Sequence, residues 1–187
     1  MKELIDDFSL ERVGKHGSKF DPEKARWFNH QYMMRKSDED LAQLLSPLLL
    51  RHGVKSDQHY ITRTVHLIRD RAILTADLWN ASWFFFVPPK TYDEQVVRKI
   101  WNQETSTLVT DFAAEAALLA EWNKDSLHTL VAEFITRKGV KMGALMNPLR
   151  LLVVGSNQGP GMMEIAELLG KKEFLSRITK NPTLSGS

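Results

Sequence analysis

Cysteine is absent from the 187 residues of the sequence. A chain without cysteine has no disulfide framework, no thiolate nucleophile and no zinc site built on cysteine. Any metal site would have to use histidine and carboxylate side chains. The absence fits a reducing compartment, and we expect a cytoplasmic protein.

Long apolar runs are also absent. The longest, WFFFVPP and LRLLVVG, fall far short of the ~20 apolar residues that span a bilayer. The N-terminus lacks a basic stretch followed by an apolar one, so we expect neither a membrane span nor an export signal. With 43% hydrophobic and 26% charged residues, the composition is that of a soluble globular protein.

The net charge of +2 does not by itself demand a polyanionic partner. The charges are unevenly distributed, because residues 88–136 hold four basic and eight acidic residues, whereas residues 137–187 hold eight basic and three acidic ones. Positive potential in the last third of the chain would attract an anion. A charged patch of this size is more often a solvated surface without a binding role.

Apolar residues recur at helical spacing along most of the chain, and no alternating pattern typical of a strand persists. Residues that begin helices precede several of these stretches, namely Asp21 before Pro22, Ser37, Asp57 and Thr75. The sequence therefore predicts an all-α fold.

A break in the helical pattern at residues 87–94, VPPKTYDE, divides the chain. Its two prolines end one helix, and Thr91 with Glu94 matches the capping-box signature that begins another. We expect two consecutive helical-bundle subdomains, at residues 1–88 and 89–180. A disordered tail at residues 181–187 would follow them.

The segment 155–161, GSNQGPG, joins two apolar stretches. Its glycine spacing fits neither the phosphate-binding loop of nucleotide enzymes nor the dinucleotide fingerprint. We interpret it as a turn between a short helix that starts at Asn147 and Pro148 and a second helix that starts at Pro160. A buried strand over residues 151–154 is the alternative for the first element.

The glycines of this turn allow two interpretations. Gly159 and Gly161 would leave backbone groups uncovered near a helix N-terminus, where they could hydrogen-bond a flat polar ligand such as an unstacked base, with Arg150 as a nearby cation. A tight helix corner without a ligand is the simpler alternative.

Two stretches resemble a known family. PLRLLVVGSNQGPGMMEIAELLGKKEFLSRI contains a Pro-Leu-Arg helix, a G-x-x-x-x-P-G loop and an E-x-x-x-L-L-G-K segment. FSLERVGKHGSKFDPEKARWFNHQY matches the pattern F-[ST]-x-E-R-V … K-F-D-x-E-K-x-x-W-x-N-x-x-Y. Both resemble the C-terminal part of bacterial glutamyl-tRNA synthetases, and the likeness covers nearly the whole chain.

The resemblance implies two helical subdomains of the class I synthetase type that bind the anticodon loop of glutamate tRNA. In that family an arginine of an L-x-R-x-R segment reads the third anticodon base, which falls here on Arg71, with Arg69 beside it. An arginine suits this role because its planar fork donates two hydrogen bonds to a base edge. The family's loop contacts with anticodon bases carry over to Arg150, Asn157, Gly159, Pro160, Gly161, Met162 and Met163.

Phosphate contacts are expected from Lys138, Lys141 and Lys171. The histidines at positions 52, 59 and 66 recur every seven residues, but we expect exposed or capping roles for them and no metal site.

The sequence does not contain the family's ATP-binding catalytic motifs, which HGSKF at His16 and MRKS at Met34 echo only superficially. We expect no catalytic residue and no cofactor in this chain, which alone should bind tRNA but not catalyse. ATP and Mg²⁺ would belong to the catalytic half of the same enzyme, the expected partner of a monomeric chain.

Two other classes of function remain as alternatives. One is a helical module that binds a protein through Trp79, Trp83 or the phenylalanines at positions 84–86. The other is a stand-alone helical enzyme, which the absence of an acid–base constellation disfavours.

Overall fold

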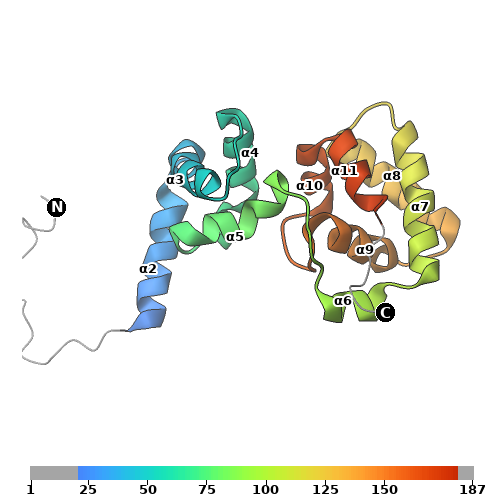
Figure 1. Ribbon diagram of the computed structural model, residues 1–187, viewed down its shortest axis with the longest axis horizontal. Coiled ribbons are helices and arrows are strands. Elements are labelled where there is room, and N and C mark those ends of the chain that lie inside the picture. The colour runs from blue at the N-terminus through green and yellow to red at the C-terminus, as the bar shows by residue number, and fades with distance from the viewer. Residues whose placement is uncertain (1–20, 181–187) are drawn as a thin grey trace, which may run out of the picture.

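The computed structural model describes residues 21–180, and over that range the chain is helical with no strand (Figure 1). The elements are α2 (Pro22–Arg35), α3 (Asp38–Arg51), α4 (Gln58–Ile68), the 3-10 turn η2 (Arg69–Arg71), α5 (Thr75–Phe86), α6 (Glu94–Ile100), α7 (Gln103–Leu118), α8 (Lys124–Lys138), α9 (Met142–Val154), α10 (Met162–Leu169) and α11 (Lys171–Ile178). The predicted all-α fold is confirmed. The sequence motif at His16 and the predicted tail lie outside the described residues.

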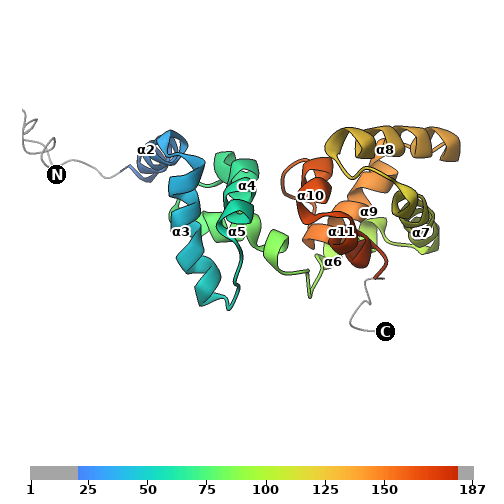
Figure 2. The same ribbon diagram turned by 90° about the horizontal axis from the view of Figure 1, so that it is seen from above.

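The helices gather in two halves, with α2 to α5 in one and α6 to α11 in the other (Figures 1 and 2). The halves contact each other, because α10 packs against both α4 and α5. Buried side chains from both halves belong to one hydrophobic cluster. The division into two subdomains at residue 88 therefore stays a prediction.

Three of the predicted helix starts are confirmed by side-chain caps. Asp21 Oδ1 accepts a hydrogen bond from the backbone N–H of Glu23 at 3.0 Å, and Ser37 Oγ accepts one from Asp40 at 3.0 Å. Asp57 Oδ1 accepts one from the N–H of Tyr60 at 2.9 Å. Each cap satisfies a donor that has no partner inside its helix.

Two other predicted caps, Thr75 and Thr91, are wrong. Residue 75 is the first residue of α5, and the carboxylate of Asp77 reaches back to the N–H groups of Ile73 and Leu74 at 3.1 and 2.9 Å. The cap of α6 is Asp93, whose Oδ1 accepts from Gln95 N at 3.0 Å. Asp93 thus takes the N-cap role predicted for Thr91, whereas Asp77 binds amides that precede α5 and no side chain caps the first turn of that helix.

The predicted helix starts around the glycine loop are also wrong. Helix α9 begins at Met142 and runs through Asn147 and Pro148. A proline inside a helix removes one backbone hydrogen bond, but the burial of seven α9 side chains offsets that loss. Helix α10 begins at Met162, which leaves Pro160 in the turn. Residues 151–154 are helical, so the strand alternative is excluded.

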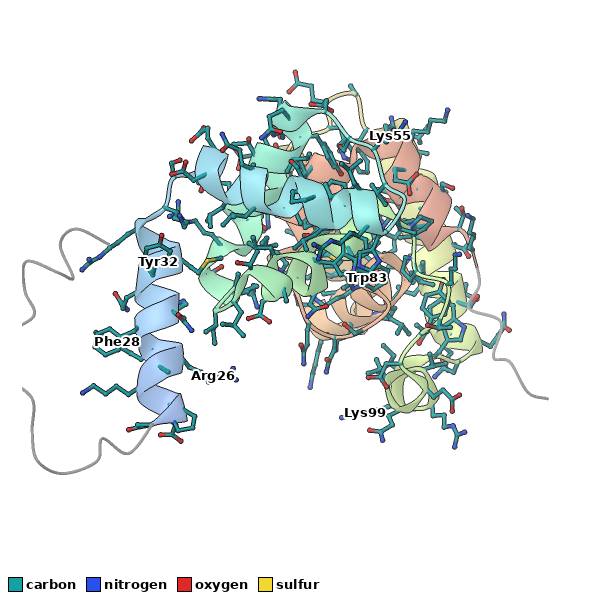
Figure 3. The ribbon with its side chains drawn as sticks, turned by 60° about the vertical axis from the view of Figure 1, so that its left-hand side comes forward. Arg26, Phe28, Tyr32, Lys55, Trp83 and Lys99 are labelled. Atoms are coloured by element: carbon teal, nitrogen blue, oxygen red, sulfur yellow. The ribbon has the colours of Figure 1, made fainter. Side chains whose placement is uncertain are left out.

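Helix α2 projects from the rest of the first half and buries little of its surface. Met33 is its one fully buried side chain, whereas Trp27, Phe28 and Tyr32 are 57%, 55% and 63% exposed. Figure 3 shows Phe28 and Tyr32 on the side of α2 that faces away from the other helices. The apolar spacing in this stretch correctly indicated a helix, but not a buried one.

Tyr60 joins α4 to the end of α5. Its hydroxyl donates a hydrogen bond to the carbonyl oxygen of Phe85 at 3.0 Å. Burial of the phenol raises the pKa of Tyr60 to about 12, although the nearby charge of Arg177 lowers it in part. The folded protein thus favours the neutral phenol over the phenolate more strongly than the unfolded chain does.

This pKa predicts a loss of stability in alkali. The folded value lies above the ordinary 10.0, so the contribution of Tyr60 is complete below pH 10 and is lost as the pH rises towards 12. Tyr60→Phe should flatten the fall of the unfolding free energy in that window. Urea unfolding at pH 8, 10 and 11, followed by circular dichroism, measures how the unfolding free energy of the wild type and of the variant changes with pH. Parallel slopes for the two proteins would contradict the prediction.

Candidate functional site

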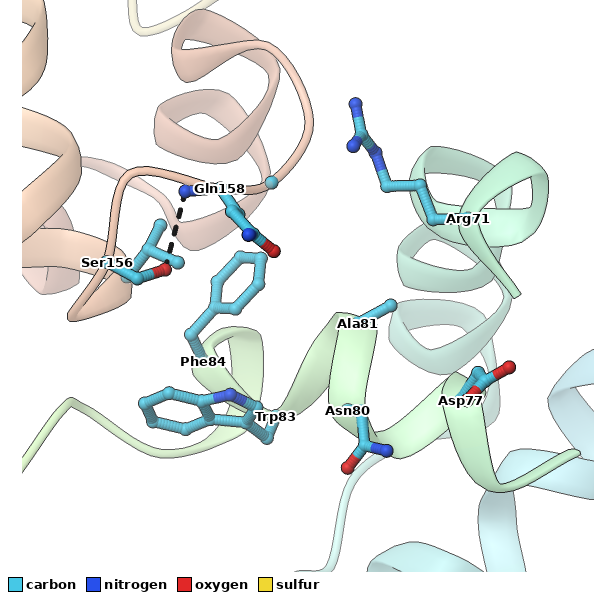
Figure 4. A pocket seen from close by; sticks show the side chains of 10 residues that line it. Arg71, Asp77, Asn80, Ala81, Trp83, Phe84, Ser156 and Gln158 are labelled. Carbon is cyan, nitrogen blue, oxygen red and sulfur yellow. Dashed lines mark hydrogen bonds between the residues drawn. The ribbon is translucent and has the colours of Figure 1, made fainter. Parts of the chain in front are cut away.

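A cleft of about 260 Å³ lies between α5 with η2 on one side and the loop after α9 on the other (Figure 4). The first wall is formed by Arg71, Asp77, Asn80, Ala81, Trp83 and Phe84, and the second by Val154, Ser156, Gln158 and Gly159. Two aromatic rings, two side-chain amides, one guanidinium and one carboxylate therefore meet around one space. This combination suits a flat ligand with a polar edge.

The loop that forms the second wall begins at Gly155. This residue ends α9 in the left-handed conformation, with φ of +85°, as the sequence predicted. Its carbonyl oxygen accepts a hydrogen bond from the N–H of Asp93 at 2.9 Å. The segment between α5 and α6 is thereby attached to the start of the loop.

The backbone conformation of Gly159 disfavours a side chain, and the space beside it is tight. Its φ of +127° is a conformation that residues with a Cβ rarely adopt, and a Cβ there would stand 3.2 Å from Nη1 of Arg150. The close approach of Arg150 to the loop backbone therefore requires glycine at this position.

Arg150 binds the backbone of this loop. Its Nη1 donates to the carbonyl oxygen of Pro160 at 2.8 Å and makes a longer contact of 3.4 Å with that of Gln158. Burial lowers the pKa of Arg150 first, and the positive charge of Arg71 lowers it further. The positive charges of the two arginines therefore repel each other.

Arg71, predicted to read a base, and its neighbour Arg69, predicted to bind tRNA beside it, have different surroundings. Arg69 donates to Asp38 Oδ1 at 2.7 Å and to the carbonyl oxygens of Met34 and Lys36 at 2.8 Å each, so its guanidinium joins η2 to the α2–α3 turn. Arg71 is exposed and extends towards the loop that carries Gln158 (Figure 4). Of the two, Arg71 is the one whose donors are available to a ligand.

The predicted loop residues separate into exposed and buried groups. Asn157 and Gly161 are exposed and Gly159 is partly so. Pro160 is buried, and Met162 and Met163 keep only 5% and 4% of their surface. The two methionine side chains belong to the hydrophobic core, so the loop presents its backbone and its polar residues to the cleft.

The three lysines predicted to contact phosphate do not gather at the cleft. Lys138 Nζ lies 2.6 Å from Asp111 Oδ2, and Lys171 Nζ donates to the carbonyl oxygen of Leu119 at 2.7 Å. Lys141 is exposed just before α9. Since α9 has 13 residues, Lys141 and Gly155 stand about 20 Å apart along its axis.

The sequence did not identify Asn80 and Gln158 as site residues, and it considered Trp83 only as core or as a protein contact. All three line the cleft. Asn80 and Trp83 are three residues apart on a predicted helix and so share a face, which was the available signal. Nothing in the sequence indicated that this face meets the loop some 75 residues later.

No group of three or more histidine, aspartate or glutamate side chains that could hold a metal ion occurs within residues 21–180. The ring of His52 stacks on Trp79 with centroids 3.9 Å apart, and His66 Nδ1 lies 2.8 Å from Asp38 Oδ2. Within the same range no helix is long and apolar enough to cross a membrane.

Comparison with known proteins defines the class. The family described as "Anticodon binding domain" matches residues 40–181 of this sequence, and the chain belongs to that family. The curated relatives that it matches include the glutamate–tRNA ligases of Flavobacterium psychrophilum, 38% identical, and Flavobacterium johnsoniae, 39% identical, each over 96% of this chain. The chain spans 36% of the length of each of these relatives.

Solved structures agree with this assignment. A glutamate tRNA ligase from Elizabethkingia meningosepticum superposes with a TM-score of 0.84 at 33% identity, over 95% of this chain and 35% of that one. The enzyme from Elizabethkingia anophelis gives a TM-score of 0.81 at 30% identity, over 95% of this chain and 34% of its own. The predicted resemblance to the anticodon-binding region of glutamate–tRNA ligases is confirmed.

The backbone of Gly159 leads to a first prediction about the loop. Gly159→Ala should destabilise the protein by about 1 to 3 kcal/mol, because alanine is strained at φ +127° and its methyl group would displace Arg150. Chemical unfolding measures the change.

Gly143→Ala is the matched control for this substitution. Gly143 lies inside α9, and a Cβ there would meet its nearest neighbour at an ordinary 3.5 Å. Alanine should stabilise the helix by up to about 1 kcal/mol. Equal effects of the two substitutions would contradict the role of Gly159.

Proposed function

We propose that this chain recognises the anticodon loop of glutamate tRNA through the cleft between α5 and the loop after α9. The observation that carries the proposal is the position of Arg71, which is exposed at the mouth of a cleft lined by aromatic and amide side chains. Such a combination suits an unstacked base, whose face stacks on a ring and whose edge hydrogen-bonds to polar groups.

Two arginines at or beside the cleft support an anionic ligand, although the carboxylate of Asp77 also lines it. Arg71 and Arg150 lie near each other, and the repulsion between them falls when a phosphate or a base with hydrogen-bond acceptors binds between them. Single-stranded loops, unlike paired RNA, expose both kinds of group to the same protein surface. In this proposal Arg71 reads a base, while Arg150 shapes the loop that faces it.

The rest of the proposed function concerns a longer enzyme. Its catalytic half would use ATP and Mg²⁺ to attach glutamate to tRNA in the cytoplasm. This chain alone would bind tRNA as a monomer without catalysing that reaction. The exposed aromatic face of α2, formed by Trp27, Phe28 and Tyr32, is the candidate contact with the catalytic half.

The structure disfavours the alternative of a protein-binding module that uses the aromatic cluster of α5. Phe84 and Phe85 are each only 3% exposed, and Trp79 is partly buried against the core. Phe84, Phe85 and Trp79 therefore offer little surface to a protein, and the partly exposed Trp83 lines the cleft.

Binding should depend on salt, since contacts with phosphates release counterions. We expect the affinity for glutamate tRNA to fall on the order of tenfold or more between 50 and 200 mM salt. Fluorescence anisotropy with labelled tRNA measures it. An affinity that does not change with salt would contradict a phosphate-based contact.

Arg71→Gln should weaken discrimination. Removing the guanidinium should cost about 1 to 3 kcal/mol of binding to glutamate tRNA and less to a copy with the glutamine anticodon. Anisotropy titrations of both tRNAs measure the two affinities at one salt concentration.

Arg51→Gln is the control for the lost charge, because Arg51 is exposed at the end of α3 and does not line the cleft. This substitution should lower the affinity for both tRNAs alike and only slightly. Equal losses for both tRNAs in Arg71→Gln would contradict a base-reading role for Arg71.

A further inference from the structure

Arg177, on α11, is a buried arginine. Only 3% of its surface is exposed, and within the described part of the chain the other buried polar residues are the uncharged Thr64 and Ser82. Burying a guanidinium is costly unless acceptors surround it. Its partners therefore show what the cation stabilises.

The guanidinium of Arg177 connects the ends of two helices. Its Nη1 donates to the carbonyl oxygen of Phe84 at 2.5 Å and to that of Val153 at 3.0 Å. Phe84 lies in the last turn of α5 and Val153 in the last turn of α9, where carbonyl groups lack partners within the helix and carry its negative end. One cation thus caps both helices.

Two further hydrogen bonds hold Arg177 and the end of α5 in place. The Nε of Arg177 donates to Glu173 Oε1 at 2.8 Å, one helical turn earlier on α11. Next to Phe84, the carbonyl oxygen of Phe85 is taken by the hydroxyl of Tyr60. The end of α5 is therefore held by α4 and α11 together.

The two capped helix ends lead directly into the walls of the cleft. Trp83 and Phe84 come from the end of α5, and Val154 with the loop that follows comes from the end of α9. One wall cannot shift against the other without breaking a hydrogen bond to Arg177.

We infer that Arg177 is a positioning residue for anticodon recognition, which sets the separation and register of the two cleft walls without touching the ligand. This inference rests on the proposed function. Arginine is required because its planar fork reaches two carbonyls and a carboxylate at once, whereas the ammonium of a lysine lacks that fork.

The test is Arg177→Lys in the full chain. At a temperature where the variant is folded by circular dichroism, its affinity for glutamate tRNA should fall about tenfold, and its preference over the glutamine-anticodon copy should fall with it. Val131→Ala is the control, because Val131 is buried in α8 and does not line the cleft. It should lower stability and leave both affinities unchanged. Wild-type discrimination in a folded Arg177→Lys protein would overturn the inference.

Hydrogen exchange gives a second measurement that needs no tRNA. In Arg177→Lys the amides of residues 84–87 and 155–161 should exchange at least about tenfold faster, and those of α8 should not. Uniform acceleration over all helices would overturn the inference. If wild-type protein binds no tRNA, the proposed function fails, and the exchange pattern alone decides whether Arg177 positions the walls.

If Arg177→Lys does not fold, Glu173→Ala replaces it in both experiments. Glu173 is partly exposed, and this substitution removes the carboxylate partner of the guanidinium while the carbonyl partners at Phe84 and Val153 remain. In Glu173→Ala we expect the same amides to exchange faster and the preference for glutamate tRNA to fall, both by less than in Arg177→Lys. Unchanged exchange at both helix ends would count against the inference.

Discussion

The hydrogen bonds between Arg177 and the ends of α5 and α9 are the constraint on which the rest of the site depends. Helices from the two halves of the chain end with unpaired carbonyl groups, and those groups would be buried without partners if the cation were absent. Because the guanidinium satisfies both, the halves meet at a fixed place. The cleft forms there, between residues about 70 positions apart in the sequence.

A second cation determines the shape of the loop itself. Arg150 binds the backbone at Pro160, and the glycine at position 159 lets it approach. It does so near a second positive charge, that of Arg71, in a partly buried position. Two like charges therefore lie at and beside the cleft, and a ligand that supplies phosphate or carbonyl oxygens lowers the repulsion between them. This arrangement supports the nucleic acid that we propose as the ligand.

The sequence predicted the helical class and several helix ends because those signals are local. Caps such as Asp57 and the left-handed Gly155 act through their own neighbours. Helix α9 was predicted too short, since Asn147 and Pro148 have the chemistry of a helix start but lie in a stretch where tertiary packing buries seven side chains.

The sequence identified only some of the residues that line or shape the cleft. The arginine and glycine positions came from the family resemblance, whereas Asn80, Gln158 and Arg177 depend on contacts between distant segments that no local pattern encodes. The sequence grouped Met162 and Met163 with the loop's ligand contacts, but their side chains lie in the core. Apolar residues at the start of an amphipathic helix serve packing first, and a loop that precedes them presents its backbone instead.

The proposed function requires that the cleft recognises a particular anticodon. The most direct measurement is the equilibrium affinity of this chain for two RNA stem-loops of identical stem, one with the glutamate anticodon and one with the glutamine anticodon, at a fixed salt concentration. A cleft that reads the anticodon should bind the glutamate stem-loop more tightly by about tenfold or more. Equal affinity for the two stem-loops would contradict the proposed function.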